Sequence, residues 1–89
     1  MQIQFIKNVQ FSRVLKADGR MREFNFRKPN GRDQAPCTVD VSDDRGHRIV
    51  FSMHKGENHW KIVSPALPTW ITQLENKFDE LIEDEISQI

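Results

Sequence analysis

The segment VLKADGRMREF, residues 14–24, contains the strongest local fold signal in this chain. Asp18-Gly19 separates two stretches in which polar and apolar residues alternate. Asp-Gly is typical of a two-residue type I′ turn, because both central positions need positive φ and these two residues tolerate it. The segment therefore predicts a β-hairpin, in which residues 20–28 return antiparallel beside a first strand that starts near the N-terminus. Because Lys7 and Arg13 interrupt the apolar parity of that strand, we expect it to be long and bent, or bulged.

Further strands with a period of two residues follow the hairpin. Residues 37–42 and 48–54 both alternate, and the turn residues between them lie at 43–46. A second turn at 55–58 leads into a last strand at 59–64. We expect a meander of four to five strands, whose common apolar face carries Phe5, Phe11, Phe24, Phe26, Val39, Val41, Ile49, Phe51, Met53, Trp60 and Ile62.

The period of the sequence changes after Ser64-Pro65-Ala66-Leu67-Pro68. Because proline is tolerated in the first turn of a helix, we expect a helix to begin near Pro68. One face of this helix is apolar and carries Trp70, Ile71, Leu74, Phe78, Leu81, Ile82, Ile86 and Ile89. The sequence thus predicts a single α+β domain over residues 1–89. A curved antiparallel sheet (1–64) is followed by one C-terminal amphipathic helix (68–87) packed on it.

The charges of the chain are divided unevenly between these two parts. The 89 residues include 13 Lys and Arg and 13 Asp and Glu, so the formal net charge is zero. Residues 1–64 hold 12 of the basic and 7 of the acidic residues, whereas residues 65–89 hold one basic and six acidic residues. We therefore expect a basic sheet and an acidic helix, and the neutral total does not exclude a polyanionic partner.

Several classes of function are disfavoured by what the sequence contains. A single cysteine, Cys37, excludes an intrachain disulfide and a cysteine-based zinc site, and its place in a strand pattern predicts a buried, inert thiol. No nucleophile elbow, Gly-rich phosphate loop or zinc-protease motif is found, so we predict no enzymatic activity and no cofactor. No apolar stretch approaches the ~20 residues of a membrane span, and we expect a cytoplasmic protein that does not associate with membranes.

His54 and His59 flank the predicted turn at residues 55–58. In a hairpin they could lie opposite each other, which would suit two imidazoles on one metal ion. No third ligand is evident, and we predict exposed hairpin histidines and no metal site.

Basic side chains on the strands are the first functional lead. The candidates for nucleic-acid binding are Arg20, Arg22, Arg27, Arg48 and Lys61. Lys and Arg attract phosphates by charge, and sheets that bind single strands add aromatic rings on which bases stack. Every Phe and Trp here falls on the expected core face or on the helix, so the opposite face offers no such rings.

The acidic end of the helix is the second lead. Glu85 projects within the apolar stripe and stands where the helix dipole disfavours a carboxylate. Either the helix end overhangs the sheet and frays, or the apolar stripe meets a second copy in which an arginine pairs with Glu85. An open edge strand would favour the same association. The candidate residues for self-association in a homodimer are Ile82, Glu85, Ile86 and Ile89.

The strand meander with its terminal helix resembles the single-stranded nucleic-acid-binding folds of the PUR type and of the transcriptional positive-cofactor type. The likeness covers residues 20–86 in outline and is most specific over 62–86, where a last strand, a Pro-containing link, Trp70, Leu74 and an acidic Ile/Leu-rich helix follow one another. It implies a dimer that binds single-stranded DNA or RNA on a curved basic sheet.

Residues 19–28 and 39–46 are in addition similar to a small bacterial family without an assigned activity. Two hypotheses result from the sequence. The first is a non-enzymatic, dimeric binding module whose sheet contacts single-stranded nucleic acid. The alternative is a protein interaction or self-association module with no nucleic-acid role.

Overall fold

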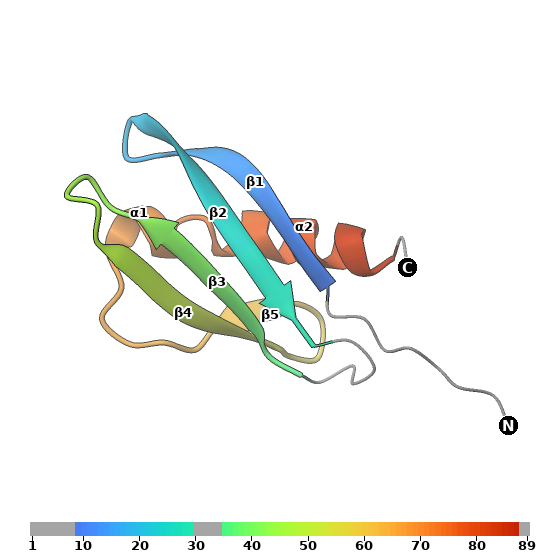
Figure 1. Cartoon of the computed structure of the whole chain (residues 1–89). Helices are drawn as coiled ribbons and strands as arrows, with labels where there is room; N and C mark the ends of the chain where they lie inside the picture. The colour runs from blue at the N-terminus through green and yellow to red at the C-terminus, as the bar shows by residue number, and fades with distance from the viewer. Residues whose placement is uncertain (1–8, 30–34, 88–89) are drawn as a thin grey trace, which may run out of the picture.

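The structure, a computed structural model, describes residues 9–29 and 35–87. Its strands are β1 (Val9–Ala17), β2 (Arg20–Lys28), β3 (Cys37–Ser42), β4 (Arg48–Lys55) and β5 (Trp60–Ile62), and its helices are α1 (Thr69–Thr72) and α2 (Glu75–Ile86). The strands form one antiparallel sheet in chain order, with the helices on one of its faces (Figure 1). The predicted α+β meander with a C-terminal helix is confirmed. The expected beginning of the first strand, including Phe5, lies outside the described residues.

The hairpin between β1 and β2 has the turn that Asp18-Gly19 predicts. Both residues have positive φ, 54° for Asp18 and 77° for Gly19. The register pairs Ala17 with Arg20 next to the turn and continues without a shift to Val9 opposite Lys28. Residues of one parity on each strand therefore share a face of the sheet along its whole length.

The core lies between the sheet and α2. Phe78 of α2 is fully buried, and its ring centroid lies 5.2, 5.8 and 5.7 Å from those of Phe24, Phe26 and Phe51. Each fully buried large side chain stabilises the fold by ~1.5–3 kcal/mol. The other buried apolar side chains of the strands include Val39, Val41, Met53 and Trp60, and the partly buried Phe11, Ile49 and Ile62 pack against them, which confirms the apolar face predicted for the described strands. Ile71 and Ile82 are the buried side chains that the helices add beside Phe78.

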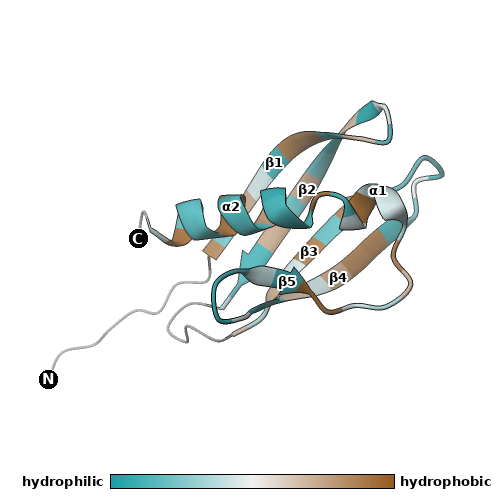
Figure 2. Cartoon of the chain, turned by 180° about the vertical axis from the view of Figure 1, so that it is seen from behind, coloured by the Kyte–Doolittle hydropathy of each residue, from teal (hydrophilic) through white to brown (hydrophobic). Residues whose placement is uncertain are grey.

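The predicted continuous helix over 68–87 is wrong in one respect, because the structure divides it into α1 and α2. The break lies at Gln73 and Leu74, where the Leu74 N–H donates to the Ile71 carbonyl three residues before it (2.9 Å). A tightened turn of this kind keeps apolar residues three or four positions apart, so the periodicity does not reveal it. The two helices occupy different positions: α1 places Trp70 beside β2, and α2 lies across the sheet (Figure 2).

Carboxylates of α2 cover the outer edge of β5. The Trp60 N–H donates to Asp79 Oδ1 (2.8 Å) and the Ile62 N–H donates to Glu75 Oε2 (2.9 Å). One turn further on, Glu83 pairs with Lys55 of β4. Residues four positions apart lie on one face of a helix, so a single ridge of α2 satisfies the outward backbone amides of this edge strand. The other edge of the sheet is β1.

Candidate functional site

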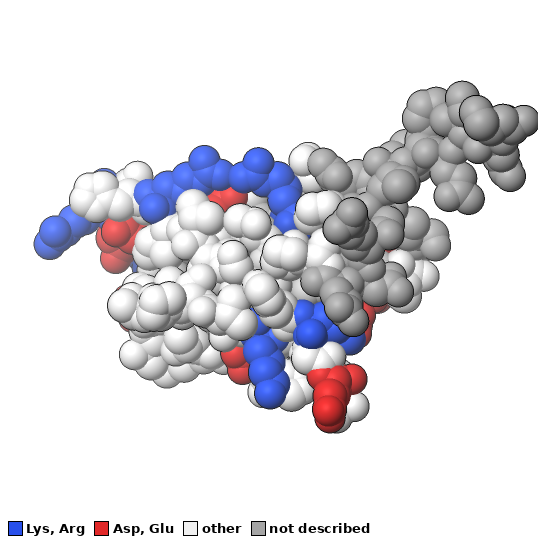
Figure 3. Space-filling view, turned by 90° about the horizontal axis from the view of Figure 1, so that it is seen from below, with Lys and Arg blue, Asp and Glu red and all other residues white. Residues whose placement is uncertain are grey.

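The face of the sheet that points away from α2, called the open face below, is the candidate site. Alternation places on it Gln10, Ser12, Val14, Lys16, Met21, Glu23, Asn25, Arg27, Thr38, Asp40, Ser42, Arg48, Val50, Ser52, His54, Lys61 and, just after β5, Val63. Figure 3 shows a row of Lys and Arg side chains along one margin of the molecule, with acidic side chains among them. The open face is therefore mixed in charge, with a basic excess from Lys16, Arg27, Arg48 and Lys61 over Glu23 and Asp40.

Asp40 of β3 is the centre of a polar network on this face and is only 6% exposed. Its Oδ1 accepts a hydrogen bond from Asn25 Nδ2 (3.0 Å), and its Oδ2 accepts one from Arg48 Nη2 (2.9 Å). Arg27 Nη2 lies 3.8 Å from the same Oδ2. On β1, Ser12 Oγ donates to Asn25 Oδ1 (2.6 Å). The network thus connects four neighbouring strands.

The network keeps the Asp40 carboxyl ionised. Burial opposes ionisation, but the hydrogen bonds from Asn25 and Arg48 and the charges of Arg48 and Arg27 outweigh it and hold the pKa of Asp40 below its ordinary value of 3.8. A carboxylate at neutral pH holds the Arg48 guanidinium by a hydrogen bond and attracts the Arg27 guanidinium by charge.

Arg27 and Arg48 remain accessible although both are near Asp40. Their side chains are 53% and 58% exposed. One carboxylate offsets one of the two positive charges, so the cluster keeps a net positive charge. A hollow of about 340 Å³ lies beside it and is lined by Gln10, Phe11, Ser12, Asn25, Phe26, Arg27, Asp40 and Arg48.

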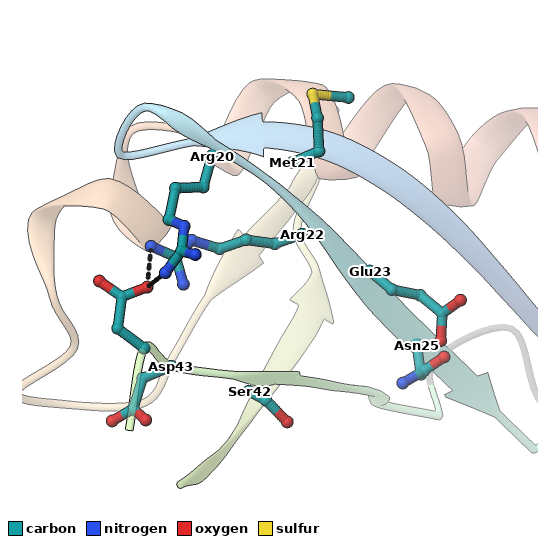
Figure 4. A pocket seen from close by; sticks show the side chains of 8 residues that line it. Arg20, Met21, Arg22, Glu23, Asn25, Ser42 and Asp43 are labelled. Carbon is teal, nitrogen blue, oxygen red and sulfur yellow. Dashed lines mark hydrogen bonds and ion pairs between the residues drawn. The ribbon is translucent and has the colours of Figure 1, made fainter. Parts of the chain in front are cut away.

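The structure places Arg20 and Arg22 away from this cluster. Both reach from β2 toward the β3–β4 turn, where Nη1 of Arg20 and Nη2 of Arg22 lie 3.0 and 2.9 Å from Asp44 Oδ1 (Figure 4). Hydrogen bonds from these two side chains hold the pKa of Asp44 below its ordinary value. Arg22 is also only 7% exposed: its Nε donates to the Ala17 carbonyl (3.0 Å), and its guanidinium lies 4.4 Å from the Trp70 ring centroid.

The five predicted nucleic-acid-binding residues therefore do not form one surface. Arg27, Arg48 and Lys61 share the open face, whereas Arg22 lies on the parity of Phe24 and Phe26, which is the covered face. The sequence already contained that signal, since Arg22 is two residues before Phe24. Sequence reasoning missed Asp40 and Asn25, because their role depends on the register between β2 and β3.

The residues predicted to mediate self-association are placed mainly inside one chain. Ile82 is 1% exposed, and Ile86 packs against the core. Glu85 pairs with Arg13 of β1 in the same chain, so neither a fraying helix end nor an arginine from a second copy is needed to explain it. Ile89 lies outside the described residues.

The two histidines do not lie opposite each other, so the arrangement that would suit two imidazoles on one metal ion is not formed; His54 is exposed as predicted, whereas His59 is half-buried. The β4–β5 register pairs His54 with Lys61, and His59 lies in the turn, where its carbonyl accepts the Gly56 N–H (2.8 Å). Over residues 9–29 and 35–87, no three His, Cys, Asp or Glu side chains are grouped to hold a metal ion.

Cys37 is fully buried, as its strand position predicts. Burial raises the pKa of its thiol to about 11, against the smaller opposing effects of a backbone hydrogen bond at Arg27 and the Lys28 charge. A thiol in this state is a poor nucleophile.

Comparisons of the chain with family models, with curated proteins and with solved structures give no match. In the described part of the chain, neither helix has the length and apolar character needed to cross a membrane. The function is accordingly inferred from the geometry of the open face.

Proposed function

We propose that this chain is a non-enzymatic module that binds single-stranded DNA or RNA through phosphate contacts on the open face. The observation that carries the proposal is the pair Arg27 and Arg48, two half-exposed side chains whose guanidinium groups both lie within 4 Å of one buried carboxylate. Guanidinium groups present N–H donors in a planar fork that matches phosphate oxygens. The resemblance to PUR-type and positive-cofactor-type folds supports the same class of ligand.

The position of Asp40 favours binding because it holds Arg48 by a hydrogen bond and attracts Arg27 by charge before a ligand arrives. Ordering a long, flexible side chain on binding costs ~0.5–1.5 kcal/mol, and part of that cost is already met in the free protein. Lys16 on β1 and Lys61 on β5 add positive charge on the two edge strands, so a nucleic-acid strand that crosses the sheet meets basic groups on both sides of the cluster.

The open face of the described strands carries no Phe, Tyr or Trp side chain, which determines the kind of binding we expect. Phosphate contacts carry no sequence information, so binding should be weak and independent of base sequence. For single strands the logarithm of the binding constant falls with the logarithm of salt concentration by about 0.7 per phosphate contact. With three or four contacts, the slope should be about −2 to −3.

Fluorescence anisotropy with labelled single-stranded oligonucleotides, at low and moderate salt, tests the proposal. Arg27→Ala and Arg48→Gln should each weaken binding about tenfold at low salt and make the salt slope shallower by about 0.7. Lys77→Ala is the matched control, because it removes one positive charge from the exposed side of α2. Equal weakening by all three variants, or the absence of binding at low salt, would show that the open face has no special role.

A second candidate function, protein interaction or self-association, is favoured by a different observation. The large hydrophobic side chains that are most exposed in the described residues all lie on the open face: Val14, Met21, Val50 and Val63, each 51–65% exposed. Val50→Ser and Arg27→Glu separate the two functions. A change of oligomeric mass in Val50→Ser with an unchanged anisotropy response favours the second function. Loss of the anisotropy response in Arg27→Glu at constant mass favours the first.

A further inference from the structure

The two edge strands of the sheet, β5 and β1, differ in whether side chains of the described residues bind their outward backbone groups. The outward amides of β5, at Trp60 and Ile62, are satisfied by Asp79 and Glu75. The β1 edge spans nine residues, from Val9 to Ala17. Exposed edges of regular strands are the surfaces on which sheets add further strands. The contrast between the edges therefore singles out β1.

The register of the hairpin shows which backbone groups of β1 point outward. A two-residue turn makes Ala17 and Arg20 a hydrogen-bonded pair, and such pairs alternate along an antiparallel ladder. The backbone N–H and C=O groups that point outward then belong to Gln10, Ser12, Val14 and Lys16. The Ser12 carbonyl accepts Arg13 Nη1 of its own chain (2.8 Å), which agrees with an outward direction. Within residues 9–29 and 35–87, no partner is found for the four outward N–H groups.

β1 has few of the features that usually prevent an edge strand from pairing with another strand. The pairing with β2 continues without a bulge, and the strand contains no proline. Lys16 lies close to the hairpin turn, and Arg13 is already engaged by Glu85. The nine-residue edge is thus regular and able to accept another strand.

We propose that β1 pairs antiparallel with β1 of a second copy of this chain, with Arg13 on the two-fold axis. In this register all nine residues pair, and each of the four outward residues finds an outward partner. On the open face Gln10 lies opposite Lys16, and Ser12 lies opposite Val14. A shift by two residues would leave outward groups unpaired at both ends of the interface, so this register is the most favourable.

The second copy fits the helix-facing side of β1 as well. Phe11 and Leu15 are partly buried and pack against the core of their own chain. In the proposed register Phe11 of each copy lies opposite Leu15 of the other, so two half-buried apolar side chains cover each other on both sides of the axis. This self-complementary pattern selects a second copy over an unrelated extended peptide.

Arg13 would meet Arg13 of the second copy at the axis. Like charges directly opposite each other disfavour pairing, but each arginine carries its own counter-ion, Glu85. The bond from Arg13 to the Ser12 carbonyl is no obstacle, because a carbonyl oxygen has two lone pairs and can accept Val14 N–H of the second copy in addition. The dimer would join two open faces into one continuous sheet, and its formation does not depend on nucleic-acid binding.

Disulfide trapping tests the register. Residues on the axis form a non-hydrogen-bonded pair with Cα atoms about 4.5 Å apart, within the range that a disulfide spans. Arg13→Cys should therefore give a covalent dimer under mild oxidation, and native Cys37 should not interfere because it is fully buried. Leu15→Cys is the matched control on the same face, since its two copies would lie about 13 Å apart along the strands.

Sedimentation equilibrium of the full chain tests the edge itself. The unmodified chain should shift with concentration from 10.5 kDa toward twice that mass. Val14→Pro removes an outward N–H and no bond to β2, so a folded Val14→Pro chain should stay monomeric, whereas Val14→Thr should dimerise. If Val14→Pro fails to fold, the disulfide-trapping experiment with Arg13→Cys and Leu15→Cys tests the proposal by itself. A chain that is monomeric up to millimolar concentration, a dimer unaffected by Val14→Pro, or equal trapping of Arg13→Cys and Leu15→Cys would overturn the proposal.

Discussion

Arg13 in the middle of β1 forms an ion pair with Glu85 near the end of α2, and the two residues lie 72 positions apart in the chain. The Arg13 guanidinium also lies 5.1 Å from the Phe11 ring centroid. Both side chains are partly buried, at 37% and 23% exposure. The pair explains how α2 tolerates a carboxylate in its last turn, where the helix dipole is unfavourable, and it connects the end of the helix to an edge strand.

Breaking this pair should destabilise the fold modestly. We expect Glu85→Gln to lower the free energy of unfolding by about 1 kcal/mol, because the pair is more buried than a typical surface ion pair but still reached by water. Glu80→Gln is the control, since Glu80 forms an exposed ion pair with Lys77 at 3.7 Å and its loss should change stability by less than about 0.5 kcal/mol. Urea unfolding at low protein concentration measures both, and equal values would contradict an anchoring role for Glu85.

The ionised state of Asp40 should make stability depend on pH in the acid range. Its pKa in the folded chain is below the ordinary 3.8, so ionisation stabilises the fold above that pH. This contribution is present at neutral pH and is lost as the pH falls from 3.8 through the folded pKa. Titration of the Asp40 carboxyl by NMR should give a midpoint below 3.8, and a midpoint at or above that value would show that burial outweighs the arginines.

Replacing Asp40 gives a second measurement of the same network. Asp40→Asn should lower the free energy of unfolding at pH 7 by about 1–3 kcal/mol, because Arg27 and Arg48 lose a charged partner and Asn25 loses a strong acceptor. Its stability should also fall less steeply below pH 4 than that of the unmodified chain. An equally steep acid decline in both proteins would assign the pH dependence to other carboxylates.

The cover over the β5 edge should depend on an acceptor oxygen at position 79. Asp79→Ala leaves the Trp60 N–H without its partner, and we expect a loss of about 1–3 kcal/mol and faster hydrogen exchange at the Trp60 amide. Asp79→Asn retains an acceptor oxygen in nearly the same place and should lose less than half as much. If the two variants behave alike, the charge of Asp79 matters and its hydrogen bond does not.

Cys37 should be unreactive in the folded chain. With a pKa of about 11, only about one thiol in a thousand is ionised at pH 8, and the side chain is fully buried. We expect no reaction with a thiol reagent over hours in native buffer and complete reaction in denaturant. A Lys77→Cys variant, exposed on α2, should gain one rapidly reacting thiol. Rapid labelling of Cys37 in the native unmodified chain would contradict its burial.

Local patterns predicted most of the fold because they act over a few residues. Asp18-Gly19 sets the hairpin through positive φ, and alternation places Phe24 and Phe26 on the core face and Arg27 on the open face. The same parity also places Arg22 on the core side, so its burial could have been predicted from the sequence. The helix break at Leu74 could not be predicted from the sequence, because the apolar periodicity is similar on both sides of it.

The sequence by itself determined the elements: a hairpin at Asp18-Gly19, strands with one apolar face, and an amphipathic acidic segment at the C-terminus. The tertiary structure decided the partners of the charged side chains. Asp40 meets Arg48 only because β3 and β4 pair in one register, and Glu85 meets Arg13 only because α2 crosses the sheet to β1. Turns and periodicity depend on neighbours in the chain, whereas ion pairs depend on which distant elements pack together, and packing is a property of the whole fold.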